Sequence, residues 1–311
     1  MPCGSGAAGA HRLATVLCGA TLVLLVFGGL VTNTGSALAV PDWPTTFGRN
    51  MFLYPWSKMA GGIFYEHSHR LVGSVVGLLT LALAAWLWIF ECRRWLCWLG
   101  VLAVALVSIQ GILGGLRVLL VNEMLAVLHG SVAPVFFALT ASLALFTSRG
   151  WSGVRGGRAG MDDRVLRRLA LATMAALYVQ IVFGAILTHL GRRLEAHLLG
   201  ACAVVLLVLA LARRIVARHS GGRALVRLVI CLGALLAVQL LVGLGAYVAR
   251  FTGPELPFSE VSVLAAPVLH RVVGAVLLAV STVLALRVCW PSVAPRAAVP
   301  LAEPLREEVA A

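Results

Sequence analysis

Long apolar segments alternate with short polar ones along most of the 311-residue chain. About 20 helical residues cross the roughly 30 Å hydrocarbon core of a bilayer. The alternation predicts an all-α integral membrane protein with eight transmembrane helices. The expected segments are roughly 13–31, 67–90, 95–116, 124–147, 168–188, 194–212, 227–248 and 266–288.

The first apolar segment has a second interpretation, because Ala37-Leu38-Ala39 resembles the cleavage site of a signal peptide. The run from Leu13 to Val31 is longer than the usual signal-peptide core and ends well before that site. We therefore expect this segment to be a retained transmembrane helix.

Composition agrees with the membrane interpretation, since 60% of the residues are apolar and only 12% are charged. The net charge of +13 raises the question of nucleic acid. However, the basic residues lie between apolar segments, as the positive-inside rule predicts, so nucleic acid is not an expected partner. If both termini are cytoplasmic, 17 of the 25 basic residues lie on that side. We expect a multi-pass protein of the inner cell membrane in this orientation.

The chain also resembles itself once. Three predicted helices share the pattern Q-x-x-x-G near one end, at Gln110 and Gly114, Gln180 and Gly184, and Gln239 and Gly243. Two repeats with four helices each would enter the membrane in the same direction. We expect two pseudo-symmetric four-helix bundles, residues 1–150 and 165–290. A disordered cytoplasmic tail, residues 291–311, would follow them.

Six of the eight histidines fall at the same predicted membrane face, and four of them open every second helix. Ionisable side chains at membrane depth are costly and usually line a site, and neutral imidazole is a common axial ligand of haem iron. We expect one ligand pair in each repeat, holding iron between facing helices. The four candidates are His69, His129, His197 and His270, while His67 and His189 are expected to be supporting residues.

Zinc or copper is an alternative interpretation, for which Glu66, His67 and His69 would supply part of a site. The seven cysteines show no C-x2-C spacing of a zinc site, and we expect all of them to be reduced.

Charged residues beside the histidines suggest further roles. Glu66 lies three residues before His69, on the same helix face, where a carboxylate in a dry site can move protons. Its alternative role is that of an acid near a helix N-terminus. Arg70 and Arg271 each follow a candidate ligand directly. They are suited either to a haem propionate or to the membrane interface.

Several stretches resemble the haem A synthase family, also called the cytochrome oxidase assembly family. The first is GGLVTNTGSALAVPDWPTTFG followed by YEHSHRLVG, in which Glu66 to Arg70 supplies the E-x-x-H-R motif. LHGSVAPVFFAL with His129, and GAYVARFTG with LHRVVGAVL, resemble later helices of the family. The resemblance covers about 15–290. The chain departs from the family in having no pair of cysteines in the outer loops and no arginine after His197. His189 therefore competes with His197 as a ligand.

The resemblance implies an oxidoreductase with eight helices that oxidises a methyl group of haem O to a formyl group, giving haem A for terminal oxidase assembly. It implies that Glu66, His69 and His129 form the catalytic set, with haem O as substrate. It further implies that His197 and His270 ligate a haem b that passes electrons. A non-enzymatic b-type cytochrome and a haem transporter or chaperone remain alternatives. Expected partners are the lipid bilayer, haem O synthase, terminal oxidase subunits and further copies of the chain.

Overall fold

The computed structural model describes residues 6–149, 151, 163–219, 222–251 and 260–290. Within these ranges, eight helices are long and apolar enough to cross a membrane, which confirms the predicted all-α membrane class. They are α1 (Ala7–Asn33), α2 (Gly62–Phe90), α3 (Arg94–Leu120), α4 (Glu123–Thr147), α6 (Arg164–Leu190), α7 (Leu194–His219), α8 (Arg223–Phe251) and α9 (Glu260–Cys289). The expected tail, residues 291–311, lies outside the described residues.

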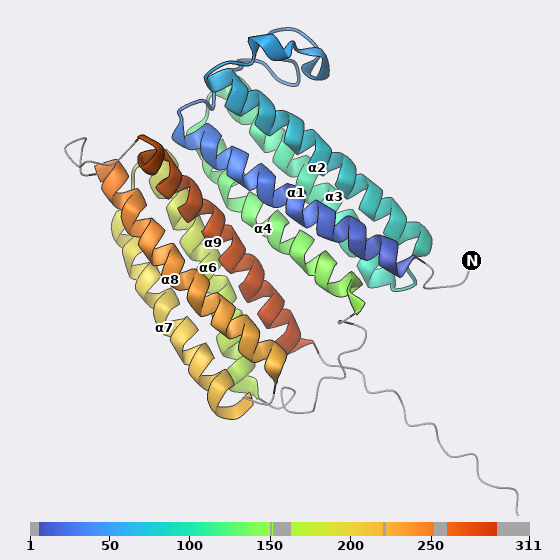
Figure 1. Ribbon diagram of the computed structural model, residues 1–311, viewed down its shortest axis with the longest axis vertical. Helices are drawn as coiled ribbons and strands as arrows, with labels where there is room; N and C mark the ends of the chain where they lie inside the picture. Colours follow the sequence, from blue (N-terminus) through green and yellow to red (C-terminus); the bar gives the residue numbers. More distant parts are fainter. Residues whose placement is uncertain (1–5, 150, 152–162, 220–221, 252–259, 291–311) are drawn as a thin grey trace, which may run out of the picture.

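The helices form two groups of four that lie side by side (Figure 1). In the first group, each of α1 to α4 contacts its sequence neighbour, and α4 closes the ring by contacting α1. The second group repeats this order from α6 to α9. Contacts of α9 with α1 and α4, and of α4 with α6, join the groups. The domain boundaries and the pseudo-symmetry stay predictions.

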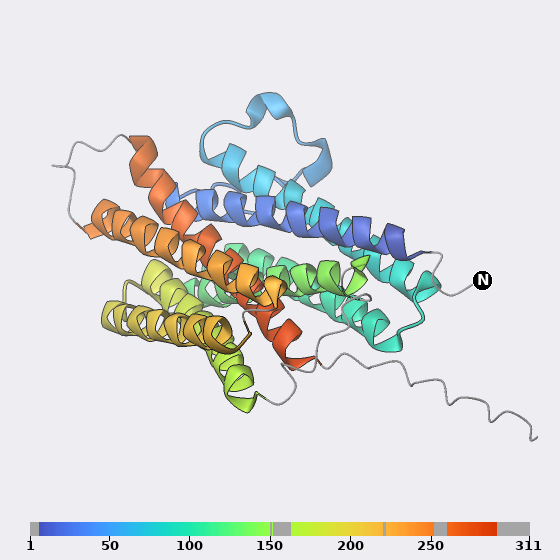
Figure 2. The ribbon, with the colours of Figure 1, turned by 60° about the horizontal axis from the view of Figure 1, so that its bottom comes forward.

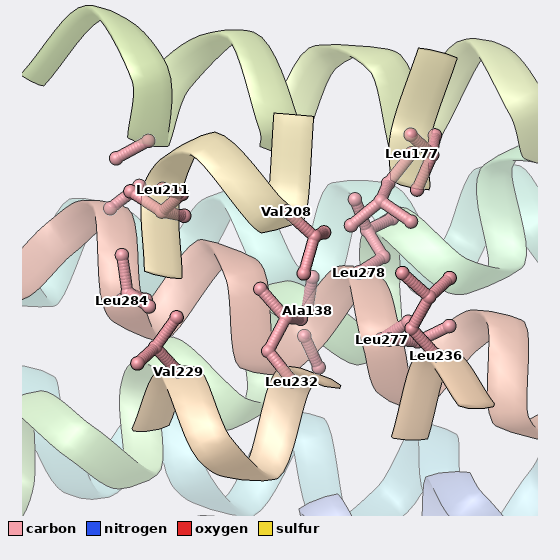
Figure 3. Close-up of a cluster of buried hydrophobic side chains, with 14 of the residues drawn as sticks. Ala138, Leu177, Val208, Leu211, Val229, Leu232, Leu236, Leu277, Leu278 and Leu284 are labelled. Atoms are coloured by element: carbon pink, nitrogen blue, oxygen red, sulfur yellow. The ribbon is translucent and has the colours of Figure 1, made fainter. Parts of the chain in front are cut away.

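Each group has its own apolar core. The core of the second group draws on all four of its helices and on Ala138 of α4, as Figure 3 shows. Leu211, Leu232 and Leu284 are almost fully buried there. Many leucines elsewhere are exposed, including Leu199, Leu206 and Leu241. This exposure suits helices that face lipid, because lipid tails are as apolar as leucine.

The connection between α1 and α2, residues 34–61, is the longest one between described helices and is called here the α1–α2 loop. It contains the short 3-10 helices η1 (Met51–Leu53) and η2 (Trp56–Lys58) and projects beyond the helices (Figure 2). Gly35 at its start and Gly61 at its end have φ angles of +67° and +56°. These left-handed conformations favour glycine, which lets the chain leave α1 and enter α2 sharply.

One expectation about cysteine is wrong. Cys92, between α2 and α3, takes part in a disulfide bond, so the cysteines are not all reduced. Cys18, Cys97, Cys202, Cys231 and Cys289 are free thiols, as expected. The scattered positions of the cysteines in the sequence therefore did not exclude a disulfide bond in the folded protein.

Candidate functional site

The first two candidate ligands face each other across the first helix group. His69 on α2 and His129 on α4 have ring centroids 6.4 Å apart, with the ring planes at 79°. An imidazole nitrogen binds a metal at about 2 Å, which puts the centres of two rings on opposite sides of one metal about 6 Å apart. The spacing of this pair therefore suits a shared metal centre.

The second pair repeats this arrangement in the second group. His197 on α7 and His270 on α9 have ring centroids 6.1 Å apart and ring planes at 74°. His197, rather than its competitor His189, is the ring that faces His270. The two pairs are alike, and both lie near the same end of the molecule, which is called here the histidine end.

A glycine on the preceding helix lies behind each ring. A Cβ atom added to Gly28, Gly114 or Gly184 would lie 3.2 Å from the Cε1 atom of His69, His129 or His197, respectively. At Gly243 it would lie only 2.8 Å from Cε1 of His270. Carbon atoms pack best at about 3.5–4.0 Å, so a side chain at any of these positions would push the ring out of place.

At His129 and His270, the residue four positions before the glycine also contacts the ring. The Nδ1 atoms of His129 and His270 lie 3.2 Å from the backbone oxygens of Gln110 and Gln239. When Nδ1–H donates to a carbonyl, the other ring nitrogen, Nε2, is left without a proton and free to bind a metal.

The glutamine side chains complete the arrangement. Nε2 of Gln110 donates to the backbone oxygen of His129 at 3.1 Å, and Nε2 of Gln180 donates to that of His197 at 2.6 Å. Nε2 of Gln239 lies 3.4 Å from Nε2 of His270. The Oε1 atoms of all three glutamines are buried and have no hydrogen-bond partner among the described residues. Sequence reasoning found the Q-x-x-x-G repeat but assigned it no role.

Glu66 and Arg70 fasten the α1–α2 loop to α2. Oε1 of Glu66 accepts a hydrogen bond from Nη2 of Arg70 at 2.7 Å, and Oε2 accepts one from the backbone N–H of Val40 at 2.9 Å. Arg70 also donates to the backbone oxygens of Val40, Asp42 and Thr45. Both terminal nitrogens of Arg70 are thus engaged within the protein. Glu66 is 4% exposed, so its carboxylate lies in a dry site.

Two aromatic contacts complete this attachment. The indole of Trp43 lies against the backbone of Gly115 on α3, the residue after the glycine behind His129. His67 is buried against the ring of Tyr54, and its Nδ1 lies 3.2 Å from the hydroxyl of Thr46. The loop therefore covers the histidine end of the first group. Sequence reasoning did not find the role of Trp43.

Asp42 shapes the loop itself. Partial burial raises its pKa, but hydrogen bonds from the Thr45 hydroxyl and from the backbone N–H groups of Gly48 and Phe47 outweigh that effect. The pKa of Asp42 therefore lies below its ordinary value. Hydrogen bonds to an ionised carboxylate favour the charged form, so Asp42 holds this turn best when it is ionised.

A cavity of about 690 Å³ opens beside the second pair. Its lining includes His197, His270, Gln180, Gln239 and His189. Pockets for cofactors usually have volumes of about 300–1,000 Å³ and are mostly apolar, with a few polar groups. His189 lies at the end of α6, near Gly130, and so borders the cavity next to the first group.

Basic side chains gather where the two groups meet. Arg271, next to His270, donates to the hydroxyl of Thr32 on α1 at 2.9 Å, and Arg250 donates to the backbone oxygen of Thr188. Arg117 on α3 lies within electrostatic range of Glu66, His129 and Arg271. None of these three arginines forms an ion pair within the described part of the chain. Such guanidinium groups suit carboxylates of a ligand.

The donor set fits haem better than a bare metal ion. The described residues contain no group of three His, Cys, Asp or Glu side chains that could hold an ion, so the zinc or copper alternative finds no support. Paired imidazoles, an apolar cavity, unpartnered glutamine oxygens and nearby arginines match a flat, iron-containing ligand with carboxylate groups. The fold and site define a helical membrane protein with two histidine pairs.

Comparison with known proteins narrows that class. Residues 56–195 match the family of cytochrome oxidase assembly proteins (COX15-CtaA). The matched range contains Glu66, His69 and His129, whereas His197 is two residues beyond it. Both histidine pairs therefore rest on geometry, and the first pair also lies within the matched range.

Three relatives are each named "Heme A synthase". The protein from Shouchella clausii is 30% identical over 58% of this chain and 60% of its own length. The protein from Exiguobacterium sibiricum is 29% identical over 55% of this chain and 56% of its own length. That from Bacillus pumilus is 34% identical over 40% of each chain. The chain therefore spans between 40% and 60% of the length of these relatives.

Proposed function

We propose that the chain is a haem A synthase-like oxidoreductase of the cell membrane, which oxidises a methyl group of haem O to a formyl group. One observation carries this proposal: the rings of His69 and His129 face each other, and Glu66, one helical turn before His69, is buried. The family of cytochrome oxidase assembly proteins matches the part of the chain that contains these residues, and the chain is similar to relatives named haem A synthase. Haem O is the substrate of the first pair.

The residues of the first helix group would have different roles in the reaction. His69 and His129 bind and orient the substrate between α2 and α4. The carboxylate of Glu66 would accept a proton and return it during successive oxidations. The α1–α2 loop, fastened by Glu66 and Arg70, covers this end and limits the entry of water. Arg117 and Arg271 are suited to the substrate's carboxylates.

His197 and His270 would hold a resident haem b, which supplies one-electron transfer when bound. The cavity beside them and the unpartnered oxygens of Gln180 and Gln239 support this assignment. Arg271 would grip a carboxylate of this haem as well, since it lies between the two groups. Arg70, whose terminal nitrogens are already engaged, would act on the loop rather than on a propionate.

The proposed orientation places both termini in the cytoplasm and the histidine end on the opposite side. The 17 basic residues assigned to the cytoplasmic side support it. Haem O synthase and terminal oxidase subunits are the proposed partners, because one would supply the substrate and the others would take the product. Self-association is a further proposal.

Haem analysis of cells that make haem O tests the function. Expression of the chain should convert haem O to haem A, and Glu66→Ala should abolish the conversion while the protein remains in the membrane. Glu91→Gln is the matched control, because Glu91 pairs with Arg93 at the other end of α2. A b-type cytochrome or a haem carrier would leave haem O unmodified in every strain. That result would refute the enzymatic proposal.

A further inference from the structure

The four candidate ligands are held unequally. A histidine bracket is defined here as the glycine behind a ring together with the residue four positions before it. The four brackets are Leu24 and Gly28 for His69, Gln110 and Gly114 for His129, Gln180 and Gly184 for His197, and Gln239 and Gly243 for His270. Three brackets carry glutamine, and the bracket of His69 carries leucine.

The glutamines make contacts that a leucine cannot make. The amide of Gln110 or Gln180 bonds the backbone of its histidine, and the amide of Gln239 approaches the imidazole itself. The side chain of Leu24 packs against Gly73, one turn beyond His69, and belongs to the apolar core of the first group. It has no polar atom to offer.

The ring nitrogens show the same inequality. Nδ1 of His129 and Nδ1 of His270 reach a carbonyl at 3.2 Å. Nδ1 of His69 and Nδ1 of His197 face the carbonyls of Leu24 and Gln180 without meeting hydrogen-bond geometry. His197 still has the bond from its glutamine, so only His69 lacks both contacts. A bond donated by the free ring N–H of a ligating histidine fixes the orientation of the ring and raises its basicity, and loss of the bond partner typically lowers metal affinity 10- to 100-fold.

We propose that His69 is the releasable ligand, the one at which haem in the first pair detaches, and that Leu24 is the positioning residue responsible. This inference rests on the proposed function, in which the first pair must take up a substrate and give up a product. The second pair, with a glutamine in both brackets, retains its haem. In the first pair, the bond from His69 would break first. His129 would stay bound and hold the haem in its site.

Transfer of haem from the purified full-length protein to excess apomyoglobin tests this inference. We expect a fast and a slow phase. His197→Ala should remove the slow phase, which assigns it to the second pair. Leu24→Gln should slow the fast phase severalfold, because its amide can bond the backbone oxygen of His69 as those of Gln110 and Gln180 bond the backbone of their histidines. Leu24→Met, of similar volume but without an amide, is the control and should leave the rate unchanged.

Glutamine-to-leucine substitutions keep the inference testable even if Leu24→Gln fails to fold. Gln110→Leu should accelerate the fast phase, and Gln180→Leu should accelerate only the slow one. The low-spin electron paramagnetic resonance signal of the first-pair haem should shift in Leu24→Gln and stay the same in Leu24→Met. Equal rates for Leu24→Gln and Leu24→Met would overturn the inference, as would a fast phase that disappears in His197→Ala.

The two proposals fail in different ways. If haem transfer follows these expectations but haem O is never converted, the enzymatic proposal is wrong and the proposed release at His69 is supported. If haem O is converted but substitutions of Leu24 do not change the transfer rates, the enzymatic proposal is supported and the proposed role of Leu24 is wrong.

Discussion

Replacing Gly243 by alanine tests the idea that glycine sets the position of a ligand ring. The added Cβ atom would lie 2.8 Å from Cε1 and 3.0 Å from Nδ1 of His270. Restoring a normal carbon contact requires a shift of about 0.7 Å. Ligand distances in metal sites hold to within about 0.2 Å, so the ring cannot keep its bond without a change elsewhere.

The expected loss follows from the cost of overpacking. Such a clash costs about 1–3 kcal/mol, which corresponds to a fall in haem affinity of roughly 5- to 150-fold. Gly233→Ala on the same helix is the matched control, since a Cβ atom there meets nothing within 4 Å. Both changes raise helix propensity by about 1 kcal/mol, so that gain cancels in the comparison.

The measurement is the amount and the dissociation rate of haem in the second pair, followed by optical spectroscopy of the purified variants. Alanine at Gly28, Gly114 or Gly184 should have a smaller effect on its own pair, because the contact there is 3.2 Å. The reasoning is refuted if Gly243→Ala retains haem as firmly as Gly233→Ala does.

Other variants test other parts of the site. His197→Ala should abolish the low-spin spectrum of the second pair, whereas His189→Ala should keep it; the opposite result would exchange their roles. Gly115→Ala should displace the tryptophan that lies against it and increase trypsin cleavage of the α1–α2 loop, with Gly111→Ala, which has free space, as control. Asp42→Asn should loosen the same loop at neutral pH. Because the folded-state pKa of Asp42 is lowered, its stabilisation is present above the unfolded-state pKa and is lost as the pH falls through the folded-state pKa. Pepsin cleavage in strong acid should therefore show no difference between this variant and the wild type.

The helices were predictable because their signal is local. A run of about 20 apolar residues satisfies its own backbone only as a helix in lipid, so length and composition are sufficient. All eight expected segments lie within helices of the structure, which extend further at most ends. α9, for example, begins at Glu260, one to two turns before the expected segment.

The histidines were predictable for a similar reason. Alternate helices enter the membrane from the same face, so a histidine near the start of every second helix must lie at one end of the molecule. Spacing alone could not choose between His189 and His197. They lie on different helices, α6 and α7. The ring of His197 reaches that of His270 only because the four-helix packing of the second group puts α7 diagonally across from α9.

The role of Arg70 shows the limit of motif reasoning. Its place beside His69 suggested either a bond to a propionate or a position at the membrane interface, and neither alternative anticipated its bonds to three backbone oxygens of the α1–α2 loop. The spacing of four residues between Glu66 and Arg70 was the available signal, since such residues are neighbours on a helix. The loop's path over α2 carries no periodicity that would reveal it.

The sequence by itself determined the membrane class, the eight helices and the end at which the histidines lie, because these follow from hydrophobicity and helical direction. The tertiary structure alone decided which rings face each other, which glycine lies behind each ring and where the glutamines and arginines are directed. Those contacts join residues on different helices, and their geometry depends on how the helices pack. Interactions between neighbours in the sequence therefore do not determine it.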